Sequence, residues 1–182
     1  MKTHMLVALL LLPAAMVWAQ KQPLAAPELP RSEENNQVYY MEVVTQEAPA
    51  AELFKRSVIW YRKFYKNPTG VLELYDSLEN KLVLKPQFAV FRDKKGVQTQ
   101  AGIVKYTLTL ACREGRYRYE IKDVNLKAAS YFPIERLFNP NDPDIEDNYH
   151  ILSETHKYFT NLLADLKAAM KEPSVKVKRD DW

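Results

Sequence analysis

The stretch IVKYTLTLACREGRYRYEIK, residues 103–122, decides the fold. Residues 113–116, which include Gly115, divide it into two halves and predict a tight reversal of the chain. In each half apolar side chains occupy every second position, which predicts two strands with one buried face. These side chains are Val104, Tyr106, Leu108, Leu110 and Cys112, then Tyr117, Tyr119 and Ile121. At Asp123 the apolar parity slips, which predicts a bulge or the end of the strand.

Upstream of this hairpin the sequence predicts a strand and then a helix. Residues 38–47 alternate, with Tyr39, Met41 and Val43 on one face and Glu42 on the other, as in a half-buried strand. After Pro49 the apolar spacing changes to that of an amphipathic helix, which Asn67 to Gly70 should end. Its stripe consists of Ala50, Leu53, Phe54, Ser57, Trp60, Tyr61 and Phe64.

Between this helix and the hairpin the period returns to two. Leu72, Leu74 and Leu78 predict a strand, and Glu79-Asn80 a short turn into a second strand over residues 82–92. Pro86 lies within that second strand and has no N–H to donate, so we expect an edge position or a bulge there. The turn signal at residues 93–96 leads into the decisive hairpin.

Downstream of the hairpin a loop and a second helix are expected. Residues 127–148 lack a sustained period and predict a structured loop packed by Tyr131, Phe132, Ile134, Leu137 and Phe138. The final helix, which Pro173 ends, has an apolar stripe of Leu152, Thr155, Phe159, Leu162, Leu163, Leu166 and Met170.

The order of elements is strand, helix, four meandering strands, loop and helix. Consecutive strands joined by tight turns pair with each other, and amphipathic helices need a sheet face to cover. The fold class is therefore α+β, a single antiparallel sheet of about five strands with two helices packed on one face. The domain should span residues 38–172. Its core should bring together Trp60, Phe64, Leu108, Leu110, Phe159 and Leu166.

Composition limits the class of protein. The chain has 182 residues, 47% hydrophobic and 27% charged, which is typical of one globular domain. Four glycines and one cysteine exclude a disulfide framework and a tetracysteine zinc site. Cys112 lies in the alternating apolar run, so we interpret it as a small buried hydrophobic residue.

The N-terminus predicts export. Lys2, an apolar run over residues 5–12 and the sequence Val17-Trp18-Ala19 are typical of a signal peptide over residues 1–19, cleaved after Ala19. The apolar stretch is too short to span a bilayer, so we expect no transmembrane helix in the mature form and a periplasmic or extracellular location. Residues 20–37, with three prolines, predict a disordered linker, and residues 173–182 a flexible tail.

Charge argues against nucleic-acid binding. The chain has 26 basic and 23 acidic residues, and removing residues 1–19 takes away Lys2, which leaves a net charge of 25 − 23 = +2. Proteins that bind nucleic acids are usually strongly basic.

The middle of the chain resembles a family of secreted bacterial domains of unknown function with a TATA-binding-protein-like (TBP-like) fold. The resemblance covers roughly residues 38–127 and rests on WYRKFY (60–65), YTLTL (106–110) and GRYRYEIKDV (115–124). The hairpin around residues 80–87 departs from the family, in which it is usually rich in glycine. The resemblance implies the same α+β fold, and it implies no activity, no functional residues and no DNA binding.

Two groups of residues could carry metal or acid–base chemistry. Asp142, Asp144 and Glu146 place oxygen ligands at alternate positions of the acidic loop 142–147, as calcium sites do, but Pro143 stands in place of a turn glycine. Acidic residues that precede a helix also interact with its positive end, which explains the loop without an ion. His150 and His156 are six residues apart, a poor spacing for a shared metal on a helix.

The first helix offers a partner surface. Lys55, Arg56, Arg62 and Lys63 lie largely opposite its apolar stripe, with Ile59 among them. Such a basic face is often only solvated, yet it could meet an envelope protein or an anionic polymer. We therefore expect an exported, non-catalytic domain that acts by binding and has no cofactor. The alternative is a small metal-dependent or hydrolytic enzyme that uses the acidic 142–147 loop and His150 or His156.

Overall fold

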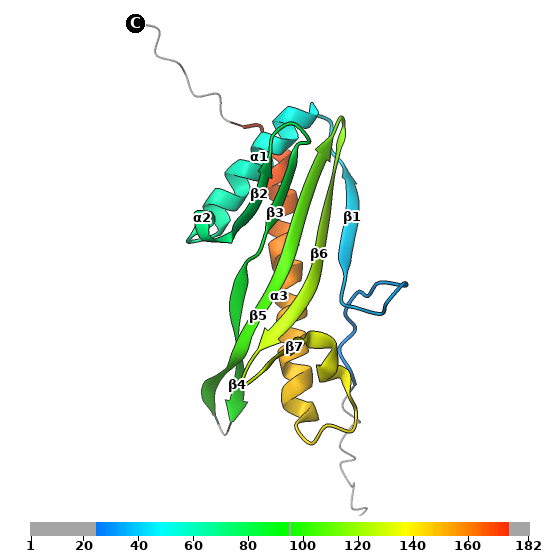
Figure 1. The fold of residues 1–182 in the computed structure, drawn as a ribbon, viewed down its shortest axis with the longest axis vertical. Coiled ribbons are helices and arrows are strands. Elements are labelled where there is room, and N and C mark those ends of the chain that lie inside the picture. The colour runs from blue at the N-terminus through cyan, green and yellow to red at the C-terminus, as the bar shows by residue number, and fades with distance from the viewer. Residues whose placement is uncertain (1–24, 95, 175–182) are drawn as a thin grey trace, which may run out of the picture.

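The computed structural model describes residues 25–94 and 96–174. Within them the chain forms an elongated antiparallel sheet with two long helices along one side (Figure 1). The elements are β1 (Tyr40–Thr45), α1 (Ala50–Phe64), α2 (Pro68–Val71), β2 (Leu72–Asp76), β3 (Lys81–Leu84), β4 (Gln87–Lys94), β5 (Val97–Arg113), β6 (Arg116–Lys127), β7 (Tyr131–Pro133), the 3-10 helix η1 (Ile134–Phe138) and α3 (Ile145–Lys171).

The described part of the sheet has seven strands rather than the expected five. Its path is β1-β6-β5-β3-β2, and β4 and β7 pair with further stretches of β5 and β6. The additional strands have two causes. Pro86 divides the expected strand 82–92 into β3, paired with residues 108–111 of β5, and β4, paired with residues 97–105. Residues 131–133 of the expected loop pair with the end of β6 as β7.

The decisive hairpin forms as predicted. β5 and β6 pair from Arg113↔Arg116 to Ile103↔Lys127, and Gly115 turns the chain with a φ of +70°. The predicted bulge is present at Asp123, which has a φ of +54° and faces a register shift between Lys105 and Thr107.

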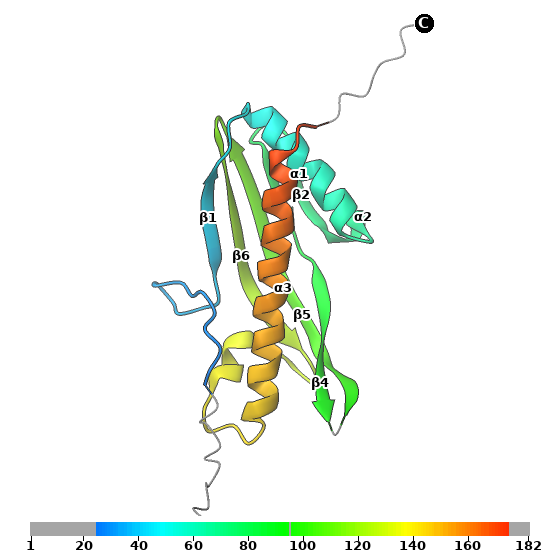
Figure 2. The same ribbon diagram turned by 180° about the vertical axis from the view of Figure 1, so that it is seen from behind.

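Both long helices cover the same face of the sheet (Figure 2), as the α+β prediction requires. Five of the six predicted core side chains are at most 3% exposed: Trp60, Leu108, Leu110, Phe159 and Leu166. Phe64 was wrongly placed among them, because it is only partly buried against this core.

The predicted face of β1 is wrong. Met41 and Val43 are 50% and 53% exposed, whereas Tyr40 is buried and packs edge-on against Phe159. The physical reason is Glu42, which lies on the helix side of the sheet, where it accepts a hydrogen bond from Lys167 of α3 at 2.6 Å.

The loop and the predicted boundaries also need correction. Tyr131 is 60% exposed instead of packing the loop, although Ile134 and Leu137 of η1 are buried. The disordered linker predicted over 20–37 is wrong in its second half, because Leu29 is 7% exposed and Arg31 bridges to Val38. The ordered domain therefore begins before residue 38.

The predicted signal peptide lies outside the described residues, as does the tail from 175 onward. The first residues of that expected tail are ordered, because Ser174 hydrogen-bonds to Glu52 of α1. Within residues 25–94 and 96–174 no helix is both long enough and apolar enough to cross a membrane.

Candidate functional site

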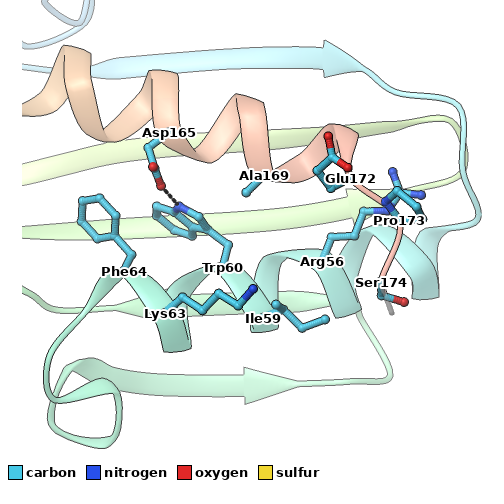
Figure 3. A pocket seen from close by; sticks show the side chains of 10 residues that line it. All are labelled: Arg56, Ile59, Trp60, Lys63, Phe64, Asp165, Ala169, Glu172, Pro173 and Ser174. Atoms are coloured by element: carbon cyan, nitrogen blue, oxygen red, sulfur yellow. Dashed lines mark hydrogen bonds between the residues drawn. The ribbon is translucent and has the colours of Figure 1, made fainter. Parts of the chain in front are cut away.

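A groove of about 590 Å³ runs between α1 and the C-terminal end of α3 (Figure 3). The apolar part of its lining comes from both helices and from Pro173, which follows α3: Ile59, Trp60, Phe64, Ala169 and Pro173. Its volume lies within the range of small-molecule sites. The helices meet here because the apolar stripes of both turn toward the sheet, which leaves their flanks to form the groove.

The aromatic floor is rigid. The indole Nε1–H of Trp60 donates a hydrogen bond to Asp165 Oδ1 of α3 at 2.7 Å, a pair that Figure 3 shows across the groove. The Phe64 ring packs against the indole with centroids 5.2 Å apart, and Tyr65 meets it edge-on at 6.1 Å. Trp60 is 3% exposed, so its ring is fixed from several sides. A ligand would meet chiefly the partly buried Phe64 ring, which the fixed indole holds in place, and this preformed arrangement limits the entropy lost on binding.

One end of the groove is closed by a polar network. Arg56 donates to the Met170 carbonyl at 2.9 Å and to Glu52 at 3.0 Å, and thereby satisfies a free carbonyl at the end of α3. Glu52 also accepts from the amide and the hydroxyl of Ser174, each at 2.7 Å. Burial alone would raise the pKa of Glu52, but these hydrogen bonds outweigh burial and lower the pKa to about 2. The carboxylate therefore pins the chain after α3 onto α1.

Two charges at the groove have no partner. Among the described residues Lys63 of α1 and Glu172 after α3 form no ion pair or side-chain hydrogen bond. Asp165 and Arg56, in contrast, are engaged by Trp60 and by the network at the closed end. The groove thus combines a fixed aromatic floor with one available cation and one available anion.

The structure divides the basic surface predicted from the sequence. Arg56, Ile59 and Lys63 line the groove, whereas Lys55 and Arg62 are exposed on α1 outside it. The position of Ile59 among charges is thereby explained, because its side chain forms part of the groove wall.

The partners from α3 were missed by the sequence analysis. Asp165, Ala169 and Glu172 follow the spacing i, i+4 and i+7, so they form a polar and small stripe beside the apolar stripe of α3. This stripe is the signal that could have located them. The residue pair Pro173 and Ser174 gave no such signal.

The acidic loop does not form a metal cluster. Asp142 accepts a hydrogen bond from the Asp144 amide at 2.9 Å, an arrangement that leads the chain into α3. Glu146 stands in the first turn of that helix, where an acidic side chain is favourable. Among residues 25–94 and 96–174 no three His, Cys, Asp or Glu side chains come close enough to hold an ion.

The two histidines do not join this loop in one site. His150 is exposed, and Nδ1 of His156 lies 2.7 Å from the hydroxyl of Tyr40 on β1. Burial raises the pKa of Tyr40, so the phenol stays protonated and can donate to the imidazole. The loop leads into the start of α3, whereas the groove is lined by this helix only from Asp165 onward, about 30 Å further along it.

The buried thiol and a group of three phenols have structural roles. Burial raises the pKa of Cys112 to about 12, which makes this thiol a packing residue, as predicted. The hydroxyl of Tyr106 lies 3.1 Å from that of Tyr65 and 3.4 Å from that of Tyr158. Burial raises the pKa of all three phenols. They form a neutral hydrogen-bonded cluster where α1, β5 and α3 meet.

The sheet, its strand order and the helices on one face define a TBP-like α+β domain. Residues 39–127 match the family described as "Domain of unknown function (DUF4468) with TBP-like fold". This segment of the chain contains α1 and β1 to β6, and its match to that family confirms the resemblance to a TBP-like domain of unknown function that was stated from the sequence.

Solved structures share the fold. One is a TBP-like protein from Parabacteroides distasonis ATCC 8503, with a TM-score of 0.64 and 19% identity over 77% of this chain and 96% of that one. Another is a DUF4468 family protein from Bacteroides ovatus ATCC 8483, with a TM-score of 0.62 and 11% identity over 83% and 93% of the two chains. No curated protein matches the chain. At these identities the structures establish the fold alone.

Proposed function

We propose that this protein is an exported, non-catalytic binding module that holds a short peptide segment of an envelope protein in the groove between α1 and α3. The observation that carries the proposal is the groove itself, in which a fixed aromatic floor lies beside Lys63 and Glu172. A bulky apolar side chain of the segment would pack against Phe64 and Ile59, over the edge of Trp60. An acidic neighbour would pair with Lys63, and a basic one with Glu172.

The charges favour a peptide over an anionic polymer at this site. A polymer with negative groups throughout would meet Asp165 and Glu172 as well as Lys63. Like charges placed together oppose binding, whereas a segment that carries both signs matches the groove. The basic residues of α1 outside the groove, Lys55 and Arg62, can add long-range attraction without contacting the segment.

The catalytic alternative has less support. The described side chains that line the groove include no histidine or cysteine, and the hydroxyl of Ser174 donates to Glu52. The acidic 142–147 loop and His150 or His156, on which an enzyme would depend, do not line this cavity. A nucleophile with an adjacent base is the arrangement that hydrolysis requires.

A pair of adjacent alanines on α3 allows a sharp test. Ala169 lines the groove, while Ala168 is exposed and does not line it. A displayed random heptapeptide library would be selected on the wild-type protein and on the variants Ala169→Trp and Ala168→Trp. We expect the wild type to enrich peptides with a bulky apolar residue next to Asp or Glu. Ala168→Trp should keep this enrichment and Ala169→Trp should lose it at least tenfold.

The control separates binding from folding. Circular dichroism and the melting temperature of both variants establish that each is folded before selection. Equal enrichment of the same peptides on folded Ala169→Trp and on the wild type would exclude the groove as the binding site.

The proposed location has its own test. Intact-mass measurement of protein isolated from the cell envelope should give a chain that starts at Gln20. A chain in the cytosol that retains Met1 would contradict export.

A further inference from the structure

The face of the sheet opposite the helices carries a second feature. Figures 1 and 2 show α1 and α3 on one side only, and alternate residues of β5, β6 and β1 point to the other side. Near the β5–β6 turn this open face is hollowed by about 230 Å³. The hollow is lined by Val43, Ala111, Arg113, Arg116, Tyr117 and Arg118.

The register brings the arginines together. Arg113 and Arg116 stand directly opposite each other across the β5–β6 ladder, and Arg118 stands opposite Ala111 in the next outward-facing row. In the same row Lys81 of β3 is paired with Ala111 from the other side. Side chains directly opposite in an antiparallel ladder are about 5 Å apart at Cβ, so three guanidinium groups can reach one small ligand.

The nearby carboxylates do not neutralise this group. Glu120 pairs with Arg118 at 3.0 Å, and Glu114 in the turn accepts a hydrogen bond from the Ala50 amide at 3.2 Å. Among the described residues neither Arg113 nor Arg116 has an ion pair. Like charges directly opposite in a ladder destabilise it. The hairpin therefore tolerates an unfavourable pair that an anion in the hollow would convert into a favourable contact.

We infer that this hollow binds a phosphoryl group. The guanidinium fork offers paired N–H donors that match phosphate oxygens, and two unpaired arginines suit a doubly charged anion. The exposed side chain of Val43 at its edge, 53% accessible, leaves room for an apolar or sugar portion next to the phosphate. The same chemistry belongs to a lipid headgroup and to a soluble phosphate compound.

Inorganic pyrophosphate is the first probe, titrated into the protein and followed by the amide resonances of residues 111–118. We expect saturable shifts centred on these residues, and at least tenfold weaker binding by Arg113→Gln/Arg116→Gln. The matched control is Lys55→Gln/Arg62→Gln, which removes the same two positive charges from α1. It should change the affinity less than twofold.

A second arm distinguishes the sources of the phosphate. Co-sedimentation with phosphatidylglycerol vesicles but not phosphatidylcholine vesicles, lost in the Arg113 and Arg116 variant, would assign a lipid headgroup. Pyrophosphate binding without vesicle binding would assign a soluble compound. If both double variants lose equal affinity, or if no resonance near the hollow moves, the inference is wrong and the attraction is only that of net charge.

Discussion

The covered face and the open face of the sheet are formed by alternate residues of the same strands, yet they differ in how their charged side chains are paired. On the covered face charged and polar side chains that meet the helices are paired with them, as Glu42 shows. Glu42 accepts from Tyr119 at 2.5 Å and from Lys167 at 2.6 Å, and these bonds, against a smaller effect of burial, lower its pKa. Among the described residues every buried side-chain nitrogen and oxygen has a hydrogen-bond partner. On the open face Arg113 and Arg116 face each other, and neither forms an ion pair with a carboxylate in the part of the chain that the structure describes.

The difference separates stability from recognition. A buried polar group without a hydrogen bond destabilises the fold by roughly 1–3 kcal/mol, so the pairing of buried polar atoms on the covered face is needed for stability. An exposed charge costs little when unpaired, and it stays available to a ligand. The groove combines both situations: Asp165 is paired with Trp60, whereas Lys63 has no ion pair with any residue that the structure describes.

The largest expected effect is on the covered face. Phe159 is 0% exposed and packs against Tyr40, Phe88 and Tyr106, so Phe159→Ala leaves a cavity that its neighbours cannot fill. We expect a loss of ~3–5 kcal/mol in the free energy of unfolding, measured by urea denaturation. Leu78→Ala is the control, because Leu78 is 91% exposed and its truncation should change stability by less than about 0.5 kcal/mol. A loss below about 1 kcal/mol for Phe159→Ala would mean that α3 is not docked.

A smaller effect is expected at the closed end of the groove. Glu52→Gln removes the charge that holds Arg56 and Ser174, and we expect a loss of about 1–2 kcal/mol at pH 7. Because the pKa of Glu52 is lowered to about 2 in the folded state, its contribution is present above its ordinary pKa near 4.5. That contribution disappears as the pH falls from 4.5 toward 2. Over this range the melting temperature of the wild type should fall more steeply with decreasing pH than that of Glu52→Gln. Parallel pH profiles would show that the network does not stabilise the fold.

How much of the fold the sequence predicts depends on how far apart in the sequence the interacting residues lie. The alternation of residues 104–112 and 117–121 and the stripe of α3 predict the hairpin, the second helix and the covered face. The face of β1 could not be predicted in this way, because apolar residues occupy both parities at Tyr40, Met41 and Val43. Its orientation depends on Lys167, which lies 125 positions away and pairs with Glu42.

The candidate site shows the same limit. Arg56, Ile59 and Lys63 stand close in sequence and were singled out together, but the other side of the groove comes from residues about a hundred positions later. One sequence does not reveal which helix flanks meet. In the sequence alone the arginines at residues 113–118 indicate only a turn and the exposed side of a strand, because their convergence depends on the ladder register.

On the open face two neighbouring substitutions should have opposite signs. Arg113→Thr removes one member of the like-charged pair and supplies a residue that favours strands, so we expect stability to rise by up to about 0.5 kcal/mol at low salt. Arg118→Thr breaks the ion pair with Glu120 and should lower stability by about 0.2–1 kcal/mol. Both differences should shrink in 1 M salt, where charges are screened. If both substitutions lower the free energy of unfolding equally in urea denaturation, Arg113 stabilises the fold through contacts other than charge.

The smallest expected effect concerns the acidic residues before α3, which resemble the open-face arginines in being a cluster of one sign. They differ in that Asp142 accepts from the Asp144 amide and Asp147 pairs with Arg92 of β4 at 3.6 Å. We therefore expect 1 mM calcium to leave the melting temperature unchanged. A site with a Kd of ~10 μM would add ~2.7 kcal/mol and raise the melting temperature by several degrees. Asp142→Asn/Asp144→Asn/Glu146→Gln is the control: a calcium-dependent rise in the wild type that this variant abolishes would establish a metal site. That result would also show that local hydrogen bonds do not distinguish a helix entry from a ligand site in this fold.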